Sequence, residues 1–230
     1  ASQMFGVPVE EITRDSPLRQ KGKIAELALG YQGGVGALKQ MGALNMGLTE
    51  DELPELVYQW RQANPNIVQF WWDTGTLAKD AIMNKTSLES PQGIKFIYEP
   101  GILFIEIASG RRLAYPNPRV EPHHKFEGRT KITFDGLQQN RWQRVDTYGG
   151  KLVENIVQAT ARDCLAEALL KLHAAGYKIA FHVHDEVVLD VPIGQGSLDD
   201  VNSILSEPLP WAPGLPLGAD GFECEYYQKD

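Results

Sequence analysis

The sequence predicts an α+β fold in which a helical part precedes a part that mixes antiparallel strands with packed helices. Residues 16–84 contain successive helical patterns, residues 91–148 contain short strand patterns separated by turns, and a long helical pattern over 150–175 precedes a hairpin. Helices followed by strands in separate runs are typical of this class. We therefore divide the chain into a helical subdomain at 1–90 and a mixed subdomain at 91–230.

The first two helices have recognisable N-termini. Ser16 can cap a helix that has Pro17 at its first position, and glycines at 33–36 end this pattern. Thr49 and Glu52 have the spacing of a capping box, which predicts that a second helix starts at Thr49.

A third helix over 66–84 carries a row of aromatic residues, Phe70, Trp71 and Trp72, which we expect in the core because large aromatic side chains usually serve packing. The short strands after it are bounded by turn dipeptides such as Pro100-Gly101. The predicted strands are 94–98, 102–107, 112–115 and 131–134. A short helix near 197–205 and a last strand at 222–227 complete the predicted elements.

Length, charge and cysteine content narrow the class of protein. The chain has 230 residues and a net charge of −8, which argues against a simple nucleic-acid binder. The charge is uneven: residues 111–151 carry nine Lys/Arg and four Asp/Glu, a net of +5, whereas residues 184–230 carry one and ten, a net of −9. Basic stretches suit phosphate backbones and acidic clusters suit cations, although two differently solvated faces give the same pattern.

The sequence also indicates where the protein is located in the cell and whether the chain is a fragment. Two cysteines far apart in the sequence fit a reducing compartment. Neither a run of about 18 apolar residues nor a signal-peptide pattern is present in the sequence, so we expect a cytoplasmic protein. The chain starts at Ala1 rather than at a methionine, which suggests a fragment.

The hairpin that carries His184-Asp185-Glu186 is a candidate metal site. Apolar residues alternate on both sides of this tripeptide, which predicts two half-buried strands that meet at the acids. Adjacent carboxylates repel each other and Asp is unfavourable in strands, so a pair held on a hairpin suggests a bound cation. A solvated Asp in an ordinary turn is the alternative.

Two helices carry further candidate residues. Arg19, Lys23, Leu27 and Tyr31 recur every four residues and line one stripe, where the cations suit phosphates and the ring suits a sugar or base. An ordinary basic surface helix is the alternative. The long helix carries Lys151, Glu154, Asn155, Gln158 and Arg162, of which the last three share a face and include amides that can read minor-groove acceptors. An ordinary amphipathic helix with a polar side is the alternative.

The order of these segments resembles family A DNA polymerases, the DNA polymerase I-like group, and especially its phage and prophage branch. The resemblance covers essentially the whole chain. It is carried by Arg19-x3-Lys23-x3-Leu27-x2-Gly30-Tyr31, by Thr147-Tyr148-Gly149-Gly150-Lys151, by Val183-His184-Asp185-Glu186 and by Trp211-Ala212-Pro213-Gly214-Leu215-Pro216-Leu217.

The resemblance implies that residues 1–90 are fingers and 91–230 the C-terminal part of the palm of a DNA-directed DNA polymerase. It implies Mg²⁺ as cofactor and dNTP and primer–template DNA as partners, with two ions about 4 Å apart in the reaction. By this resemblance, Arg19 and Lys23 contact the triphosphate, Lys23 also protonates the leaving pyrophosphate, and Tyr31 contacts the nascent base pair. On the long helix, Gln158 contacts the minor groove, with Lys151, Asn155 and Arg162 beside it. In the hairpin, Asp185 binds the metal, and Glu186 and His184 occupy catalytic positions.

The sequence departs from the family at three places. Leu27 stands where Phe or Tyr is usual, Gln32 stands where Gly is usual, and the other metal-binding motif, Asp-Tyr/Phe-Ser-x-Ile-Glu, does not occur. We therefore expect an incomplete fragment that is inactive alone, and a palm sheet completed by another polypeptide or by a homodimer. The alternatives are a single-subunit RNA polymerase, against which Glu186 argues, and a non-catalytic DNA-binding or scaffold fragment.

Overall fold

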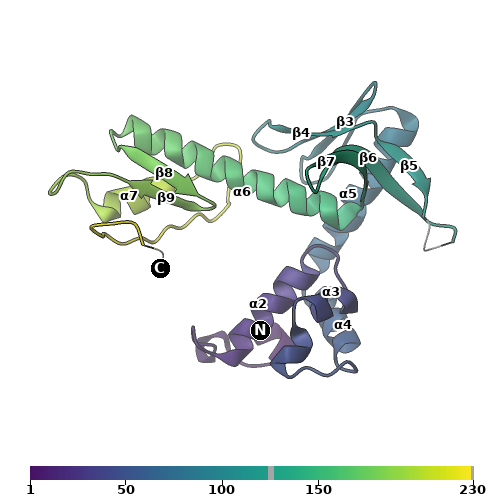
Figure 1. Ribbon diagram of the computed structural model, residues 1–230, viewed down its shortest axis with the longest axis horizontal. Coiled ribbons are helices and arrows are strands. Elements are labelled where there is room, and N and C mark those ends of the chain that lie inside the picture. Colours follow the sequence, from purple (N-terminus) through teal and green to yellow (C-terminus); the bar gives the residue numbers. More distant parts are fainter. Residues whose placement is uncertain (124–126, 229–230) are drawn as a thin grey trace. The chain divides into compact units, whose positions relative to one another are not determined.

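The computed structural model describes residues 1–123 and 127–228, and it confirms the α+β class. The chain forms two compact units. Unit 1 comprises Ala1–Glu106 and Arg112–Asn155, and unit 2 comprises Ile107–Arg111 and Ile156–Asp230. Figure 1 shows the elements of each unit along the chain. The boundary between fingers and palm near residue 90 stays a prediction, because these units are defined by contacts rather than by subdomain.

Unit 1 begins with short helices that pack on one another. Ser16 caps α2 as predicted, because its hydroxyl accepts from the Leu18 N–H at 3.3 Å. Only half of the predicted Thr49–Glu52 capping box forms: the N–H and the hydroxyl of Thr49 both donate to the Glu52 carboxylate at 2.7 Å, and the Glu52 N–H donates to the Thr49 backbone carbonyl rather than to its hydroxyl. It closes a turn rather than the predicted helix start, since the helix begins at Leu53. The helices are α1 (Ser2–Phe5), η1 (Val9–Glu11), α2 (Pro17–Leu29), α3 (Val35–Gln40), η2 (Ala43–Met46), α4 (Leu53–Ala63) and α5 (Pro65–Asn84).

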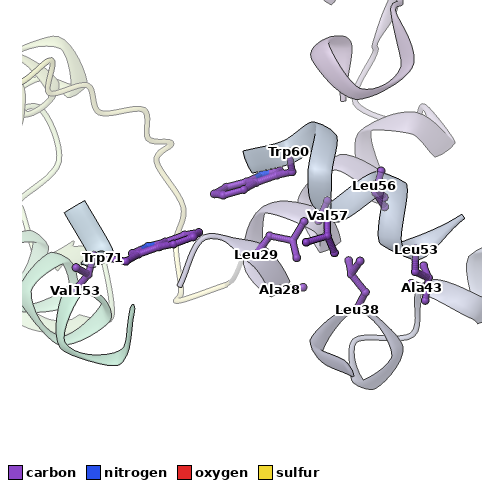
Figure 2. Close-up of a cluster of buried hydrophobic side chains, with 11 residues drawn as sticks. Ala28, Leu29, Leu38, Ala43, Leu53, Leu56, Val57, Trp60, Trp71 and Val153 are labelled. Carbon is purple, nitrogen blue, oxygen red and sulfur yellow. The ribbon is translucent and has the colours of Figure 1, made fainter. Parts of the chain in front are cut away.

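Two tryptophans are central to the core of unit 1. Trp60 of α4 and Trp71 of α5 stack with ring centroids 5.7 Å apart and planes 4° apart, as Figure 2 shows. Their indole N–H groups donate to Glu26 at 3.0 Å and to the Gly30 carbonyl at 2.9 Å, so neither buried donor is left unpaired. Around them lie buried side chains from α2 to α4 and from α6: Ala28, Leu29, Leu38, Ala43, Leu53, Leu56, Val57 and Val153.

The expectation that the whole aromatic row lies in the core was wrong for one residue. Trp71 is fully buried and Phe70 packs against the core, but the side chain of Trp72 is 55% exposed. Consecutive helical residues point about 100° apart, so three adjacent positions cannot all face one core.

Two antiparallel sheets follow the helices in unit 1. The first has the order β1-β2-β3-β4 and the second β5-β6-β7. The bounds are β1 (Leu88–Glu89), β2 (Lys95–Glu99), β3 (Ile102–Glu106), β4 (Arg112–Pro116), β5 (Arg119–Pro122), β6 (Thr130–Gln138) and β7 (Arg141–Thr147). The predicted strands correspond to β2, β3, β4 and the first half of β6. Strands β5 and β7 were not predicted, because their polar residues hide the alternation.

Helix α6 (Gly149–Ala174) starts in unit 1 against the end of α2 and against α5. A Cβ on Gly149 would lie 2.0 Å from the Trp71 carbonyl oxygen, and one on Gly150 would lie 2.4 Å from the Tyr31 carbonyl oxygen. Both positions therefore require glycine, because backbone atoms at that distance cannot move aside cheaply.

Unit 2 contains the rest of α6, the hairpin of β8 (Ile179–Val183) and β9 (Glu186–Leu189), and α7 (Leu198–Leu205). The strand predicted at 222–227 was wrong, because within the described chain β8 and β9 pair only with each other and leave that segment without a partner strand. Trp211 donates to Glu167 of α6 at 2.8 Å, which anchors the C-terminal loop.

The turn between β3 and β4 belongs to unit 2. Ser109 donates to the Asp163 carboxylate on α6, and the Arg111 guanidinium binds the same carboxylate at 2.9 and 3.1 Å. Arg111 also donates to the Ala159 carbonyl at 2.5 Å. Asp163 thus fixes this turn to α6 by several bonds at once. Among the described helices, none is both long and apolar enough to cross a membrane.

Candidate functional site

The predicted stripe on α2 forms an exposed edge of unit 1. The opposite face of α2 is buried, through Ile24, Ala25, Ala28 and Leu29. Arg19 and Lys23 are exposed, and the side chain of Leu27 is 52% exposed. The prediction that Tyr31 lies on the same helix was wrong, because α2 ends at Leu29; Tyr31 lies in the turn that follows and is half-buried against the core.

Neither the Arg19 nor the Lys23 side chain forms an ion pair or hydrogen bond with the described residues. Residues one turn apart on a helix are separated by about 6 Å along its axis. The two cations therefore present unneutralised donors at a spacing that suits adjacent phosphate groups, and Leu27 and Tyr31 continue the stripe with apolar surface.

Gln32 has a role that the sequence did not show. It adopts a left-handed backbone conformation, with φ of 68°, which favours glycine. Its side-chain oxygen accepts from the Gly150 N–H at 2.9 Å, at the N-terminus of α6. One of the unpaired donors of the helix end is thereby satisfied, and the end of the α2 stripe is joined to the start of α6.

Tyr115 accounts for the position of Asn155, a predicted DNA contact on α6. The Asn155 amide donates to the Tyr115 hydroxyl at 3.0 Å. Tyr115 is buried, and burial raises the pKa of its hydroxyl above the usual value. At least one donor of Asn155 is therefore engaged inside unit 1.

The other predicted contacts on α6 are more open. Lys151 is exposed and pairs with Glu154 at 2.8 Å. Gln158 and Arg162 are exposed. The terminal nitrogens of the Arg162 guanidinium lie 3.3 and 3.4 Å from the two ring nitrogens of His182 on β8. Arg162 therefore joins α6 to the hairpin within unit 2.

The hairpin presents its acids at a tight turn. Val183 pairs with Glu186, which leaves His184 and Asp185 as the two loop residues. His184 has φ of 52°, a left-handed value that histidine tolerates better than most residues. Asp185 is exposed and Glu186 is half-buried on β9. Two carboxylates at the same end of a hairpin are thus available to a ligand from solvent.

The acids of the hairpin supply only part of a Mg²⁺ site. Within the described chain, no three His, Cys, Asp or Glu side chains are grouped so that they could hold a metal ion. Mg²⁺ typically binds through one or two carboxylates together with substrate phosphates and water. Asp185 and Glu186 can supply these carboxylates, and the other ligands would come from a substrate or from another segment. The magnesium site stays a prediction.

The chain shows high similarity to a phage DNA polymerase. It is 60% identical to the DNA polymerase of Bacillus phage SP02. The match extends over 231 residues, which is the whole of this chain and 36% of that polymerase. The chain therefore spans about a third of the length of this relative. No protein-family model and no solved structure matches the chain.

The aligned region spans the positions of all the predicted site residues, because it covers the whole chain and therefore both units. The α2 stripe, Lys151 and Asn155 lie in unit 1, whereas Gln158, Arg162 and the hairpin acids lie in unit 2. Within unit 1, Arg19, Lys23 and Leu27 lie along one exposed edge of α2. Within unit 2, Arg162 contacts His182, which lies two residues before the hairpin turn.

Proposed function

We propose that this chain is the fingers and C-terminal palm part of a DNA-directed DNA polymerase of the family A type. The observation that carries the proposal is the 60% identity to a phage DNA polymerase over the whole chain. The exposed stripe on α2 and the acidic hairpin turn support it, since each has the chemistry that nucleotide addition needs. The substrates are dNTPs and primer–template DNA.

In this proposal the α2 stripe binds the incoming nucleotide. Arg19 and Lys23 hold the triphosphate, and Lys23 protonates the pyrophosphate that leaves. Tyr31 lies beside the nascent base pair. Leu27 lies beside the sugar, where a branched aliphatic side chain replaces the aromatic ring usual in the family. A guanidinium and an ammonium that have no partner among residues 1–123 and 127–228, both on one exposed helix edge, support this assignment.

The hairpin and α6 hold the DNA and the cation. Asp185 binds Mg²⁺, Glu186 stands beside it and His184 lies near the primer terminus. When bound, Mg²⁺ stabilises charge on the reacting phosphate. Gln158 contacts the minor groove, and Lys151, Asn155 and Arg162 extend the DNA-binding side of α6. Among these, Asn155 has the weakest support, because Tyr115 already accepts from its amide.

A further carboxylate must come from outside these 230 residues, because no second metal-binding motif accompanies Asp185. The edges of the β8–β9 sheet have no strand partner in the described chain, and another segment, another polypeptide or a second copy can pair there. We expect the isolated chain to be inactive. Template-dependent primer extension by the purified 230-residue protein would contradict this part of the proposal.

The test of the metal role is Asp185→Ala in the longer polymerase. A lost Mg²⁺ ligand removes several kcal/mol of transition-state stabilisation, so we expect nucleotide addition to fall by more than about 100-fold. Binding of primer–template DNA should change by less than about threefold, since Asp185 carries no positive charge.

Asp190→Ala is the matched control. Asp190 is an exposed carboxylate at the open end of the same hairpin, paired with Lys178 at 3.0 Å. Exposed ion pairs contribute little to stability, so this variant should keep nucleotide addition near the wild-type rate. The proposed metal role is wrong if Asp185→Ala still synthesises DNA, or if both variants lose activity equally.

A further inference from the structure

The hairpin of β6 and β7 ends in a tight, exposed turn. The two strands are joined by Gln139 and Asn140 alone, with φ values of 51° and 58°. Two left-handed residues in a two-residue loop match the twist of paired strands and hold the hairpin ends in a fixed geometry. The side chains next to this loop are therefore held in a fixed arrangement before any ligand binds.

Leu137 and Trp142 form a cross-strand pair next to this loop. Their side chains are 67% and 65% exposed. They lie on the face of the hairpin opposite to Ile132 and Phe134, and Phe134 makes an edge-to-face contact with Tyr115 at 5.0 Å. The pair therefore stands on the outer face, and the inner face of the same strands supplies the packing.

The polar residues around the pair favour an anionic ligand. From Gly136 to Gln143 the tip contains amides and Arg141 but no acidic residue. Arg141 pairs with Gln138 at the end of the hairpin, so it lies on the face opposite to Trp142. Its side chain is exposed there and has no ion pair or hydrogen bond with the described residues. The nearest acid, Asp135, is bound by Arg144 at 3.0 Å and by Asn117 at 2.7 Å, so its charge is already compensated. The tip also lies within the basic stretch 111–151, with its net charge of +5.

We propose that this tip, made of Leu137, Trp142 and Arg141, binds single-stranded nucleic acid by stacking an unpaired base on the Trp142 indole. An indole stacks on any base. A strand that continues from the Trp142 face around the end of the hairpin reaches the Arg141 guanidinium on the other face, which can bind a backbone phosphate. Bases in a duplex hide their faces, so the exposed ring fits an unpaired base better. The assignment goes beyond the proposed nucleotide addition and does not depend on it.

The test measures binding of the 230-residue protein to a fluorescein-labelled oligothymidylate of about 20 nucleotides, longer than the site of one typical single-strand binding module. Loss of one stacked base predicts that Trp142→Ala weakens this binding roughly 5- to 100-fold, while Trp142→Phe keeps most of it. Arg141→Gln should reduce the dependence of log affinity on log salt by about 0.7, because one phosphate contact is removed.

Trp72→Ala is the matched control, since Trp72 is a comparably exposed tryptophan on α5 of the same unit. Binding by this variant should equal that of the wild type, and circular dichroism should show all variants folded. The proposal is overturned if Trp142→Ala binds the oligothymidylate as wild type does, if Trp72→Ala weakens binding equally, or if Trp142→Ala weakens binding to a blunt duplex as much as binding to the single strand.

Discussion

Gln32 shows how a single residue can carry both strain and a compensating bond. Its backbone is left-handed, and its side chain caps the first turn of α6 through the Gly150 N–H. Gln32→Ala keeps the strained conformation and loses the bond, so we expect the free energy of unfolding to fall by about 1 kcal/mol. Gln32→Gly loses the same bond but relieves the strain, and should be more stable than Gln32→Ala by several tenths of a kcal/mol.

Urea unfolding of the two variants and the wild type measures these differences. Equal stability of Gln32→Ala and the wild type would show that the cap contributes nothing. A glycine variant less stable than the alanine variant would show that the left-handed backbone is not strained.

For single residues, the sequence patterns predicted which side chains are exposed better than they predicted the hydrogen-bond partners of those side chains. The stripe on α2 is an exposed edge as its spacing indicated, and Asp185 lies at the predicted turn. The bond between Asn155 and Tyr115 could not be predicted, since nothing in a helical spacing shows what the facing sheet presents. The exposure of Trp72 was missed for a simpler reason, because adjacent helical positions cannot share one core.

At the level of elements, the start of α6 depends on close backbone contact. We expect Gly149→Ala to lower the free energy of unfolding by more than about 2 kcal/mol, because its Cβ would overlap the Trp71 carbonyl oxygen. Gly36→Ala is the matched comparison: Gly36 lies inside α3, and an added Cβ would meet nothing within 4 Å. That variant should gain about 0.5–1 kcal/mol, because alanine loses less backbone entropy in a helix.

Thermal or urea unfolding of both alanine variants measures the contrast. A Gly149→Ala protein as stable as the wild type would mean that α6 can shift away from α5 without cost. A destabilised Gly36→Ala protein would mean that α3 has a constraint beyond its backbone conformation.

Local signals predicted most of the longer helices and the β8–β9 hairpin: capping residues and breakers marked helix ends, and alternating apolar residues marked the two strands. The start of α2 and both ends of α6 agree closely with the predictions, whereas α2 ends at Leu29, before the predicted glycines at 33–36. The strand β7 was missed, because residues such as Arg141 and Gln143 on its inner side conceal the period of two that marks a half-buried strand. The wrongly predicted strand at 222–227 has the right composition, but a strand needs a hydrogen-bonded neighbour, and composition does not supply one.

At the scale of the whole molecule, burial is concentrated in unit 1 and along α6. Neither β8 nor β9 contains a fully buried residue, whereas α2 and α4 each contribute several. A two-stranded sheet with little buried surface is marginal by itself, so its hydrogen bonds should open more often than those of the core helices. This matters for the proposed function, because the turn at Asp185 depends on that sheet for its position.

Hydrogen exchange followed by mass spectrometry tests this difference in stability. Amides of Ile179–Val183 and Glu186–Leu189 should exchange at least about tenfold faster than those of Ile24–Leu29, corresponding to about 1.4 kcal/mol less protection. If the open edge of the hairpin pairs with a second copy, protection of the hairpin should rise with protein concentration while that of α2 stays constant. Equally slow exchange in both segments at low concentration would contradict the expectation. It would mean that packing on α6, through contacts such as that of Arg162 with His182, stabilises the hairpin as strongly as the tryptophan core stabilises α2.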